Sequence, residues 1–476
     1  MATFPSITSE YFEDYSATVD DTSPQNDKKN INPKDKETDM KCALLFSVSK
    51  PLAVISGAGI AGVAASLELR EQGYDVVLVE MRKKFTRHNV INFNVGVQAF
   101  LKRHNLVEEF EKSEVAKVGR ITKHKYIVID KAGSVNPLFE NDVSGLFLQE
   151  TFSYKSEELD GLFEKDGIYS AKICDLQEFL VDHARKKGVN IITGERVRFT
   201  PYMPEDRKEG VKEVVVNGTT LHPDLFFIAE GAHSTTARDL GLNSKTVVNV
   251  CSGENWVFGN MPYDGDETFV VSVIDTSEKV LRIANVIFNA RSKVVNIALT
   301  IDDEIDLAEC KTQMQKIAQR VFEYIFPAVK MRTEELVPLQ DPTKVENRIQ
   351  EQFSKGNVFV LGDTAGNSSP LAGLGGSLGL TLYPYAVSQL LNDLKHCPLN
   401  MHKNFNDCLV ATVNRWMNKS AAIKTIICTI DGEQQDKGKE VRTVGSEEPI
   451  MEGVDQTVQI EELATEKKEE TAGNDR

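Results

Sequence analysis

Two short apolar runs near the start of the chain frame a helical segment. Leu52–Ser56 and Asp75–Glu80 have the length of buried parallel strands, and residues 60–72 between them read as a helix that Gly73 ends. Three glycines lie between the first run and the helix. This pattern predicts a βαβ unit with a glycine-rich turn.

Farther along, the apolar pattern predicts a second, mostly antiparallel sheet. Residues 124–130 and 134–138 read as a hairpin, and residues 256–258, 268–274, 281–288 and 294–300 read as successive strands. Two further strands are expected at 189–198 and 213–216. Helices are expected at 95–106, 172–187, 306–325, 374–394 and 403–427, and residues 139–168 form a polar excursion.

The glycines of the first unit have the spacing of a dinucleotide-binding turn. Gly57 allows the tight turn, Gly59 lets the backbone approach a pyrophosphate, and Gly62 lets the helix pack on the sheet. Glu80 ends the second strand, where a carboxylate accepts hydrogen bonds from ribose hydroxyls and disfavours a 2′-phosphate. The expected nucleotide is FAD or NAD, and a purely structural turn is the alternative. The residues assigned to this site are Gly57, Ala58, Gly59, Ile60, Ala61, Gly62, Glu80 and Met81.

A second motif favours FAD over NAD. An apolar strand runs into Gly362-Asp363, and a glycine-rich turn with Gly375 and Gly376 leads into another helix. A carboxylate at the strand end can bind a ribityl hydroxyl, and backbone amides of the glycine-rich turn can lie against the pyrimidine edge of a flavin. The alternative is an ordinary strand, turn and helix with a solvated Asp363.

A third block, residues 225–238, is again a strand followed by an acidic residue and glycine, Glu230-Gly231. The three blocks in this order resemble the group A flavoprotein monooxygenases, over about residues 50–395. The resemblance implies an α/β fold: a Rossmann-like FAD-binding domain with an inserted, mostly antiparallel β substrate domain and C-terminal helices. It also implies NADH or NADPH as co-substrate, and hydroxylation of a substrate by O₂ through a flavin C4a-hydroperoxide.

Within that family, residues 80–90 resemble a segment of the MICAL monooxygenase domains. The resemblance implies that Arg82, Arg87 and Asn89 contact the adenosine and pyrophosphate, and that Gln177 lies near the flavin. Arginine suits phosphate because it is an obligate cation with planar donors, although a solvated basic turn is the alternative. The family's Asp-Gly is Glu230-Gly231 here, and the extra methylene predicts altered handling of the pyridine nucleotide. The family's amide side chains are missing from the Gly375-Gly376 loop, and actin, the MICAL substrate, is not carried over.

The expected organisation has five parts. Residues 1–45 form a disordered acidic segment; residues 50–130, 168–245 and 345–395 form the FAD-binding domain; residues 131–167 and 246–344 form the substrate domain; residues 396–431 form a C-terminal helical segment; and residues 432–476 form a disordered acidic tail.

Charge supports this organisation. The formal net charge of the 476 residues is −16, with nine acids against four lysines in residues 1–40 and thirteen acids against six bases in residues 433–476. An acidic chain without a basic face argues against nucleic acid as a partner. Glutamates at 461–470 resemble the C-terminal signals of effectors exported by type IV machines, although a solubilising tail is the favoured interpretation.

Other features narrow the protein class. Residues 43–69 are largely apolar, but a strand, glycine turn and helix explain them without a membrane span. The acidic N-terminus lacks the basic start of a signal peptide, and seven scattered cysteines favour a reducing, cytoplasmic compartment without a disulfide framework. The eight histidines show no ligand spacing, so no metal site is expected. The oligomeric state is left open.

These observations predict an FAD-dependent monooxygenase acting on a small-molecule or protein substrate. The flavin carries the chemistry, so no catalytic side chain is assigned. His233 is interpreted as a surface turn residue and Trp416 as core packing. One rival is a halogenase or prenyl-reductase-like enzyme on the same fold, although the Trp-x-Trp signature of tryptophan halogenases is absent. The other is a non-enzymatic flavoprotein acting as an exported effector.

Overall fold

The computed structural model describes residues 50–92, 95–113, 115, 120–121, 123–139, 168–277, 281–290, 292–301, 305–327, 332–339, 341–372 and 374–437. Residues up to Asp431 form one compact unit, and residues from Gly432 onward form a second. The expected acidic segment at 1–45, the polar excursion within 140–167 and the tail beyond residue 437 lie outside the described residues.

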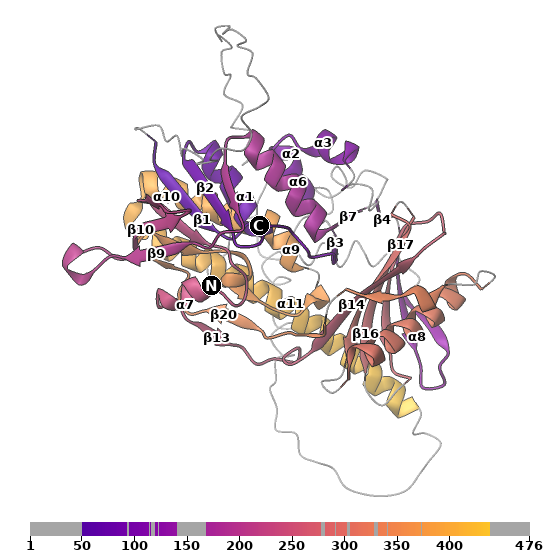
Figure 1. The fold of residues 1–476 in the computed structure, drawn as a ribbon. Helices are drawn as coiled ribbons and strands as arrows, with labels where there is room; N and C mark the ends of the chain where they lie inside the picture. Colours follow the sequence, from indigo (N-terminus) through magenta and orange to yellow (C-terminus); the bar gives the residue numbers. More distant parts are fainter. Residues whose placement is uncertain are drawn as a thin grey trace, which may run out of the picture. The chain divides into compact units, whose positions relative to one another are not determined.

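The first sheet contains the predicted βαβ unit (Figure 1). Its strands are parallel except for β21 at one edge. In spatial order they are β21 (Ser354–Lys355), β22 (Val358–Val360), β12 (Leu225–Ile228), β1 (Leu52–Ser56), β2 (Asp75–Glu80) and β8 (Asn190–Thr193). This order brings the ends of β1, β12 and β22 together, and each of these three strands leads into one of the three predicted motifs.

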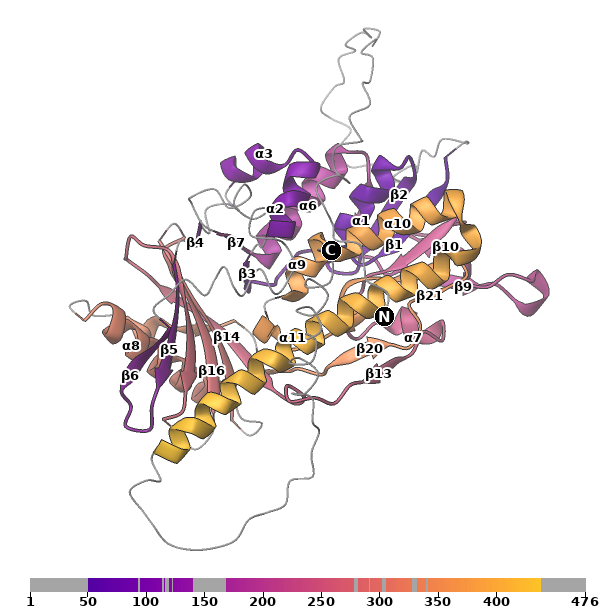
Figure 2. The ribbon, with the colours of Figure 1, turned by 180° about the vertical axis from the view of Figure 1, so that it is seen from behind.

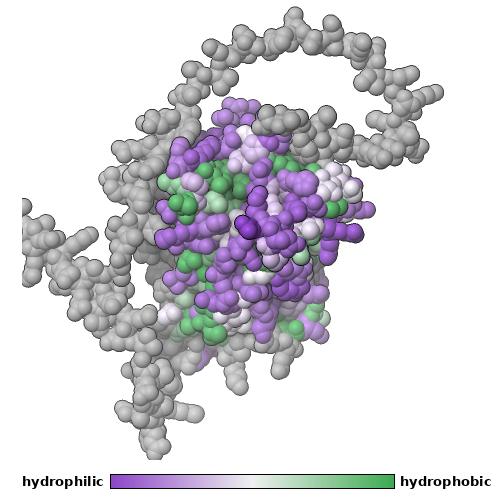
Figure 3. Space-filling model, turned by 90° about the vertical axis from the view of Figure 1, so that its left-hand side faces the viewer, coloured by the Kyte–Doolittle hydropathy of each residue, from purple (hydrophilic) through white to green (hydrophobic). Residues whose placement is uncertain are grey.

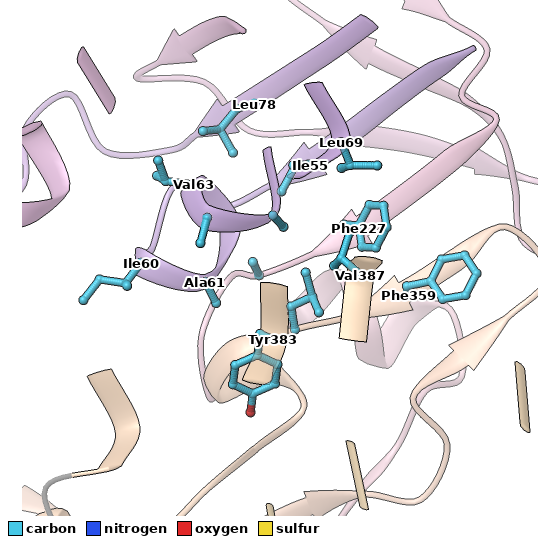
Figure 4. Close-up of a cluster of buried hydrophobic side chains, with 14 of the residues drawn as sticks. Ile55, Ile60, Ala61, Val63, Leu69, Leu78, Phe227, Phe359, Tyr383 and Val387 are labelled. Carbon is cyan, nitrogen blue, oxygen red and sulfur yellow. The ribbon is translucent and has the colours of Figure 1, made fainter. Parts of the chain in front are cut away.

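Helices cover this sheet because its strands are apolar on both faces. Helix α1 (Ile60–Glu71) packs against α6 (Ile173–Lys186), α9 (Leu374–Leu380) and α10 (Leu382–His396). In Figure 4, Phe227 and Phe359 extend from the sheet towards Val387 and Tyr383 of α10, near Ala61 of α1. The core is therefore built around the helix that follows the glycine-rich turn.

The second sheet has eight strands, and α8 (Leu307–Ile325) covers one of its faces (Figure 1). Only the β5–β15 pair is parallel. In spatial order the strands are β18 (Val337–Pro338), β14 (Asn255–Pro262), β17 (Val294–Ile301), β16 (Arg282–Asn289), β15 (Phe269–Asp275), β5 (Lys123–Ile129) and β6 (Val135–Phe139), and β19 (Thr343–Lys344) also pairs with β14. The predicted mostly antiparallel sheet is present.

Three smaller sheets and the remaining helices complete the described fold. The sheets are β11 (Thr219–Leu221), β10 (Val211–Val216) and β9 (Arg198–Pro201); β13 (Ser244–Thr246), β20 (Arg348–Gln350) and β23 (Gly366–Asn367); and β3 (Val90–Asn92), β7 (Ile168–Lys172) and β4 (Arg120–Ile121). The helices are α2 (Val95–Arg103), α3 (Val107–Lys112), α7 (Thr235–Asp239) and α11 (Met401–Lys437).

Several predicted boundaries differ from the structure. The limit at 130/131 cuts the β5–β6 hairpin, whose two strands both belong to the second sheet because β5 also pairs with β15. The strand expected at 189–198 ends at Thr193, since Gly194 turns the chain with a φ of +82°. The helix expected at 374–394 is interrupted at Thr381, and the helix expected at 403–427 is longer, from Met401 to Lys437.

Helix α11 runs along the back of the first unit in Figure 2. Its Trp416 side chain is 5% exposed and donates from Nε1 to the Ser369 carbonyl at 3.1 Å, as expected for core packing. No helix among the described residues is long and apolar enough to cross a membrane. The face shown in Figure 3 is mostly hydrophilic, with hydrophobic residues in small separate patches.

A buried charge cluster joins α1 to the end of α2. Glu68 is fully buried and lies 2.5 Å from the Arg103 guanidinium, and the His104 ring lies 2.8 Å from Glu71 and 3.4 Å from Glu68. Burial alone lowers the pKa of His104, but the hydrogen bonds and charges of Glu68 and Glu71 outweigh it and raise the pKa above 6.5.

This cluster predicts a pH-dependent stability. A histidine whose pKa is raised on folding stabilises the protein fully below pH 6.5, and the contribution disappears as the pH rises through the folded-state pKa. His104→Gln should therefore lower the midpoint of thermal unfolding at pH 5.5 and have a smaller effect at pH 9. Unfolding of both proteins across this range measures the difference, and a penalty that grows with pH would contradict the prediction.

Candidate functional site

The turn between β1 and α1 contains two glycines that the fold itself requires. Gly57 has a φ of +106°, and a Cβ there would lie 2.3 Å from the Ala229 carbonyl oxygen. A Cβ on Gly62 would lie 2.0 Å from the Gly57 carbonyl oxygen. Both approaches are far closer than atoms tolerate, so any side chain at either position would displace the turn.

Gly59 is different, because the protein leaves room for a side chain there. Its φ is −61°, and a Cβ would meet only the Ala229 carbonyl oxygen at 3.7 Å, an ordinary contact. Gly59 is also the N-cap of α1, where no side chain accepts a hydrogen bond from the first-turn N–H groups of the helix. The residues present therefore fit an anion placed at this helix end.

The Glu80 carboxylate is held beside this turn. Its side chain is nearly buried, and its two oxygens accept hydrogen bonds from the backbone N–H groups of Ala58 and Arg82, each at 2.9 Å. Gln177 on α6 donates from Nε2 to the Ala58 carbonyl at 3.2 Å. The structure thus places Gln177 directly against the glycine-rich turn, together with Glu80.

The segment with the predicted arginines is tied to the start of α6. The backbone carbonyls of Arg87 and Asn89 accept hydrogen bonds from the N–H groups of Cys174 and Ile173, at 2.8 and 2.9 Å. Arg82 and Arg87 are exposed, as is Met81, and Asn89 is half-buried. Arg82, Arg87 and Asn89, which were predicted from the family resemblance, therefore lie on one segment beside the site. The two arginine side chains are exposed to solvent.

The second and third motifs meet each other and the first. The Gly231 N–H donates to Thr364 Oγ1 at 3.0 Å, and the Thr364 hydroxyl donates to the Gly231 carbonyl at 3.1 Å. A Cβ on Gly362, whose φ is +62°, would lie 3.1 Å from the Ala61 side chain. Three blocks that are distant in sequence thus converge at one end of the parallel sheet, where ligands bind in open α/β folds.

Gly375 and Gly376 have a packing reason for lacking side chains. A Cβ on Gly375 would lie 2.8 Å from the Trp416 ring, and one on Gly376 would lie 3.1 Å from Ile91. These glycines let α9 approach α11 and β3 closely. Their assignment as cofactor-binding residues stays a prediction, since close packing alone accounts for them.

Comparison with known proteins identifies the family. The model of the FAD binding domain family matches residues 51–396, most of the chain. The chain belongs to the FAD binding domain family. The match confirms the predicted FAD cofactor, the predicted fold and the assignment to the FAD-dependent oxidoreductases.

Solved structures show the same fold at low sequence identity. Aklavinone-11 hydroxylase, in complex with FAD and aklavinone, has a TM-score of 0.54 and 19% identity over 74% of this chain and 64% of that chain. p-Nitrophenol 4-monooxygenase from Pseudomonas putida has a TM-score of 0.54 and 18% identity over 82% of this chain and 98% of that chain. The flavin-dependent halogenase CmlS has a TM-score of 0.59 and 16% identity over 88% of this chain and 71% of that chain. A comparison with curated proteins finds no significant match.

The predicted FAD-binding residues fall into two sets, one for each end of the cofactor. Gly59 and Glu80 fit the pyrophosphate and ribose, because the first leaves space at a helix N-terminus and the second fixes a carboxylate at the strand tip. Asp363, which follows β22, fits the ribityl chain. Burial raises the pKa of the Asp363 carboxyl, and the positive charge of Arg87 lowers it in part.

The raised pKa of the Asp363 carboxyl predicts that a substitution there has opposite effects on the stability of the flavin-free protein and on FAD binding. Asp363 is half-buried and its carboxylate is partly desolvated, which disfavours the folded state in the absence of a ligand, so Asp363→Asn should stabilise the flavin-free protein. The same change removes a charge-assisted hydrogen bond to FAD and should weaken FAD binding by roughly tenfold or more. Denaturant unfolding of the flavin-free protein and FAD titration measure the two effects. Asp341→Asn, at an exposed position, is the control, and a loss of flavin-free stability in Asp363→Asn would contradict the argument.

The Glu230 side chain turns inward. Its carboxylate accepts hydrogen bonds from the hydroxyls of Ser56 at 2.5 Å, Ser234 at 2.6 Å and Thr236 at 2.7 Å. Ser234 also caps α7 by accepting from the Ala237 N–H. The extra methylene that distinguishes Glu230 from the family's Asp therefore lets the carboxylate reach β1 and α7, which argues against the hypothesis that it obstructs the pyridine nucleotide.

Sequence reasoning missed the hydroxyl groups that join the motifs. Ser56 and Thr364 directly adjoin the predicted glycine turns, so their position next to each turn was the available signal. Tyr383, whose hydroxyl donates to the Gly362 carbonyl at 3.1 Å, lies on a helix and had no such signal. Burial and the nearby Asp363 charge raise the pKa of Tyr383, which keeps it a neutral donor.

His233 is exposed in the turn before α7, as expected. The six cysteines in the described part of the chain are free thiols. Among the described residues, no group of three or more His, Cys, Asp or Glu side chains could hold a metal ion.

Proposed function

We propose that this protein is a monooxygenase that uses NADH or NADPH and O₂ to hydroxylate a small molecule held beneath the second sheet. The observation that carries the proposal is that the FAD-binding motifs adjoin that sheet. Val90, next to the MICAL-like segment, packs against Val270 and Ile287, and Leu371, before α9, packs against the buried cluster that contains Trp256.

FAD, when bound, supplies hydride acceptance and activation of O₂. The protein's own residues bind and orient it. Gly59 leaves the first turn of α1 open to the pyrophosphate, Glu80 positions the ribose, and Asp363 binds the ribityl chain. Val90 and Leu371 pack on apolar residues of the sheet beside the FAD-binding motifs, and this apolar contact would exclude water from the reacting region.

We also propose that, within the family, this protein is most similar to the MICAL-type monooxygenase domains. This proposal is supported by residues 80–90 and by the hydrogen bonds that join Arg87 and Asn89 to α6. The halogenase alternative has the support of a shared fold with CmlS. Hydroxylation is preferred because the three motifs occur in the same order as in the hydroxylase family.

The test starts from purified protein reconstituted with FAD. Stopped-flow measurements follow flavin reduction by NADH and by NADPH without oxygen, and a substrate library is then screened in air for stimulated nucleotide oxidation. A product heavier by one oxygen atom supports the proposal. A halogenated product in chloride or bromide selects the halogenase, and retained FAD that neither nucleotide reduces selects the non-enzymatic flavoprotein.

A further inference from the structure

The two faces of the second sheet differ in composition. The outer face of β14–β17 is hydrophobic and packs on α8, with Met314, Ile317 and Val321 in the same cluster. The inner face, turned towards β3 and α9 (Figure 1), mixes apolar and polar residues. On these four strands, which the structure describes completely, the inner positions are Trp256, Phe258, Asn260, Pro262, Val270, Ser272, Ile274, Ile283, Asn285, Ile287, Asn289, Val294, Asn296, Ala298 and Thr300.

One row on the inner face is half-buried on all four strands, whereas the two adjacent rows are buried except at Asn260. Phe258, Ala298, Asn285 and Ser272 are paired in register across the four strands, and all four are half-buried. We call this row the inner strip. Since the middle of a sheet is ordinarily covered, the inner strip is unusual in keeping solvent-accessible surface on all four strands.

The rows on both sides of the inner strip are covered by residues that adjoin the FAD-binding motifs. On one side the next row contains Ile287 and Val270, which pack on Val90. On the other side the next row contains Ile283 and Ile274, in the cluster on which Leu371 packs. Because Val90 and Leu371 both adjoin FAD-binding motifs, the inner strip lies opposite the cofactor region.

The polar groups of the strip are neutral and held in place. Ser272 donates from its hydroxyl to Asn285 Oδ1 at 2.8 Å, and in the neighbouring row Asn296 Nδ2 donates to Asn260 Oδ1 at 2.5 Å. An amide has two donor hydrogens and two acceptor lone pairs, so one bond between neighbours leaves further hydrogen-bonding capacity. The fifteen inner positions include no acidic or basic residue.

We infer that the inner strip selects an uncharged, ring-bearing substrate through the Asn285 amide and the Phe258 ring. This inference rests on the proposed function and adds the substrate class and a specificity-determining residue. An apolar ring is stabilised against Phe258 and Ala298, and a neutral polar group pairs with the amide. A carboxylate or ammonium group meets no opposite charge at the fifteen inner positions of β14–β17 and loses its hydration on entry.

The experiment uses the FAD-loaded protein and ring-matched probes. These are 4-hydroxybenzamide, 4-hydroxybenzoate and tyramine, and the corresponding amide, acid and amine on a naphthol ring. Binding is measured by calorimetry and by the change in flavin absorbance. At least one neutral amide should bind, and its ring-matched acid and amine should bind roughly a hundredfold more weakly.

Variants of Asn285 test the residue itself. Asn285→Asp keeps an acceptor for the Ser272 hydroxyl, so the fold is retained. This change should weaken binding of the amide probe by about tenfold and strengthen binding of the amine probe. Asn285→Leu should weaken the amide and leave the amine unbound. Asn243→Asp and Asn243→Leu are the matched controls, because Asn243 is exposed between α7 and β13, and they should bind like the wild type.

The outcomes separate the inference from the proposed function. An acid probe that binds as tightly as its amide overturns the inference, as does an Asn285→Asp protein that binds like Asn243→Asp. A protein that binds none of the six probes, yet is reduced by NADH or NADPH, overturns the inference alone. A protein that holds FAD but is reduced by neither nucleotide overturns the proposed function.

Discussion

Replacing Gly59 with valine should give a folded protein that does not bind FAD. The side chain fits the protein itself, because the Gly59 backbone is extended at a φ of −61° and a Cβ meets only the Ala229 carbonyl oxygen at 3.7 Å. The added methyl groups then occupy the approach to the α1 N-terminus, where we expect the pyrophosphate to bind. We expect loss of the yellow colour and at least about a hundredfold weaker FAD binding, since charge-assisted hydrogen bonds contribute about 1.5–3 kcal/mol each. Circular dichroism and FAD titration measure the two properties.

Gly62→Val is the contrasting variant. Its Cβ would overlap the Gly57 carbonyl oxygen at 2.0 Å, so this change should damage the fold as well as binding. Gly73→Ala, at a glycine with open space around it, adds a side chain outside the site, though its φ of +88° carries a backbone cost. A Gly59→Val protein that retains FAD at wild-type affinity would contradict the assignment of this turn to the pyrophosphate.

The comparison of Gly59 with Gly57 and Gly62 shows what sequence reasoning can reach. The spacing predicted the βαβ unit, and the strand, turn and helix are present at Leu52–Ser56 and Ile60–Glu71. Local patterns succeed here because one short segment contains all the information. The roles predicted for Gly57 and Gly62 agree with the close contacts that a Cβ would make there, whereas the contact of Gly57 with Ala229, which is distant in sequence, is seen only in the structure.

The limits of prediction elsewhere have the same cause. A hairpin strand was expected at residues 124–130 and is present at Lys123–Ile129, but its pairing with β15 places it in the second sheet, and nothing within the segment specifies that partner. Gly375 and Gly376 matched a cofactor loop, although Trp416 and Ile91 supply a packing reason. Long-range packing therefore decides both the domain boundary and the meaning of a glycine.

Glu230→Asp should destabilise the protein without accelerating flavin reduction. The shorter side chain cannot hold the hydroxyls of Ser56, Ser234 and Thr236 together, because these groups come from β1 and from the start of α7. Losing one or two such bonds costs about 1–3 kcal/mol of unfolding free energy, the usual range for hydrogen bonds to a charged acceptor. Denaturant unfolding and stopped-flow reduction by NADPH measure the two properties, and Glu205→Asp, at an exposed position, is the control.

The effect on reduction follows from how the neighbouring turn is held. Gly231 is anchored separately by Thr364, through hydrogen bonds to its N–H and carbonyl at 3.0 and 3.1 Å, so the backbone beside the cofactor stays in place when Glu230 is shortened. Reduction should then remain at the wild-type rate or slow as α7 loosens. Faster reduction at unchanged stability would show that the carboxylate leaves its three hydroxyl partners in the working enzyme and obstructs the nucleotide, as the family comparison alone suggested.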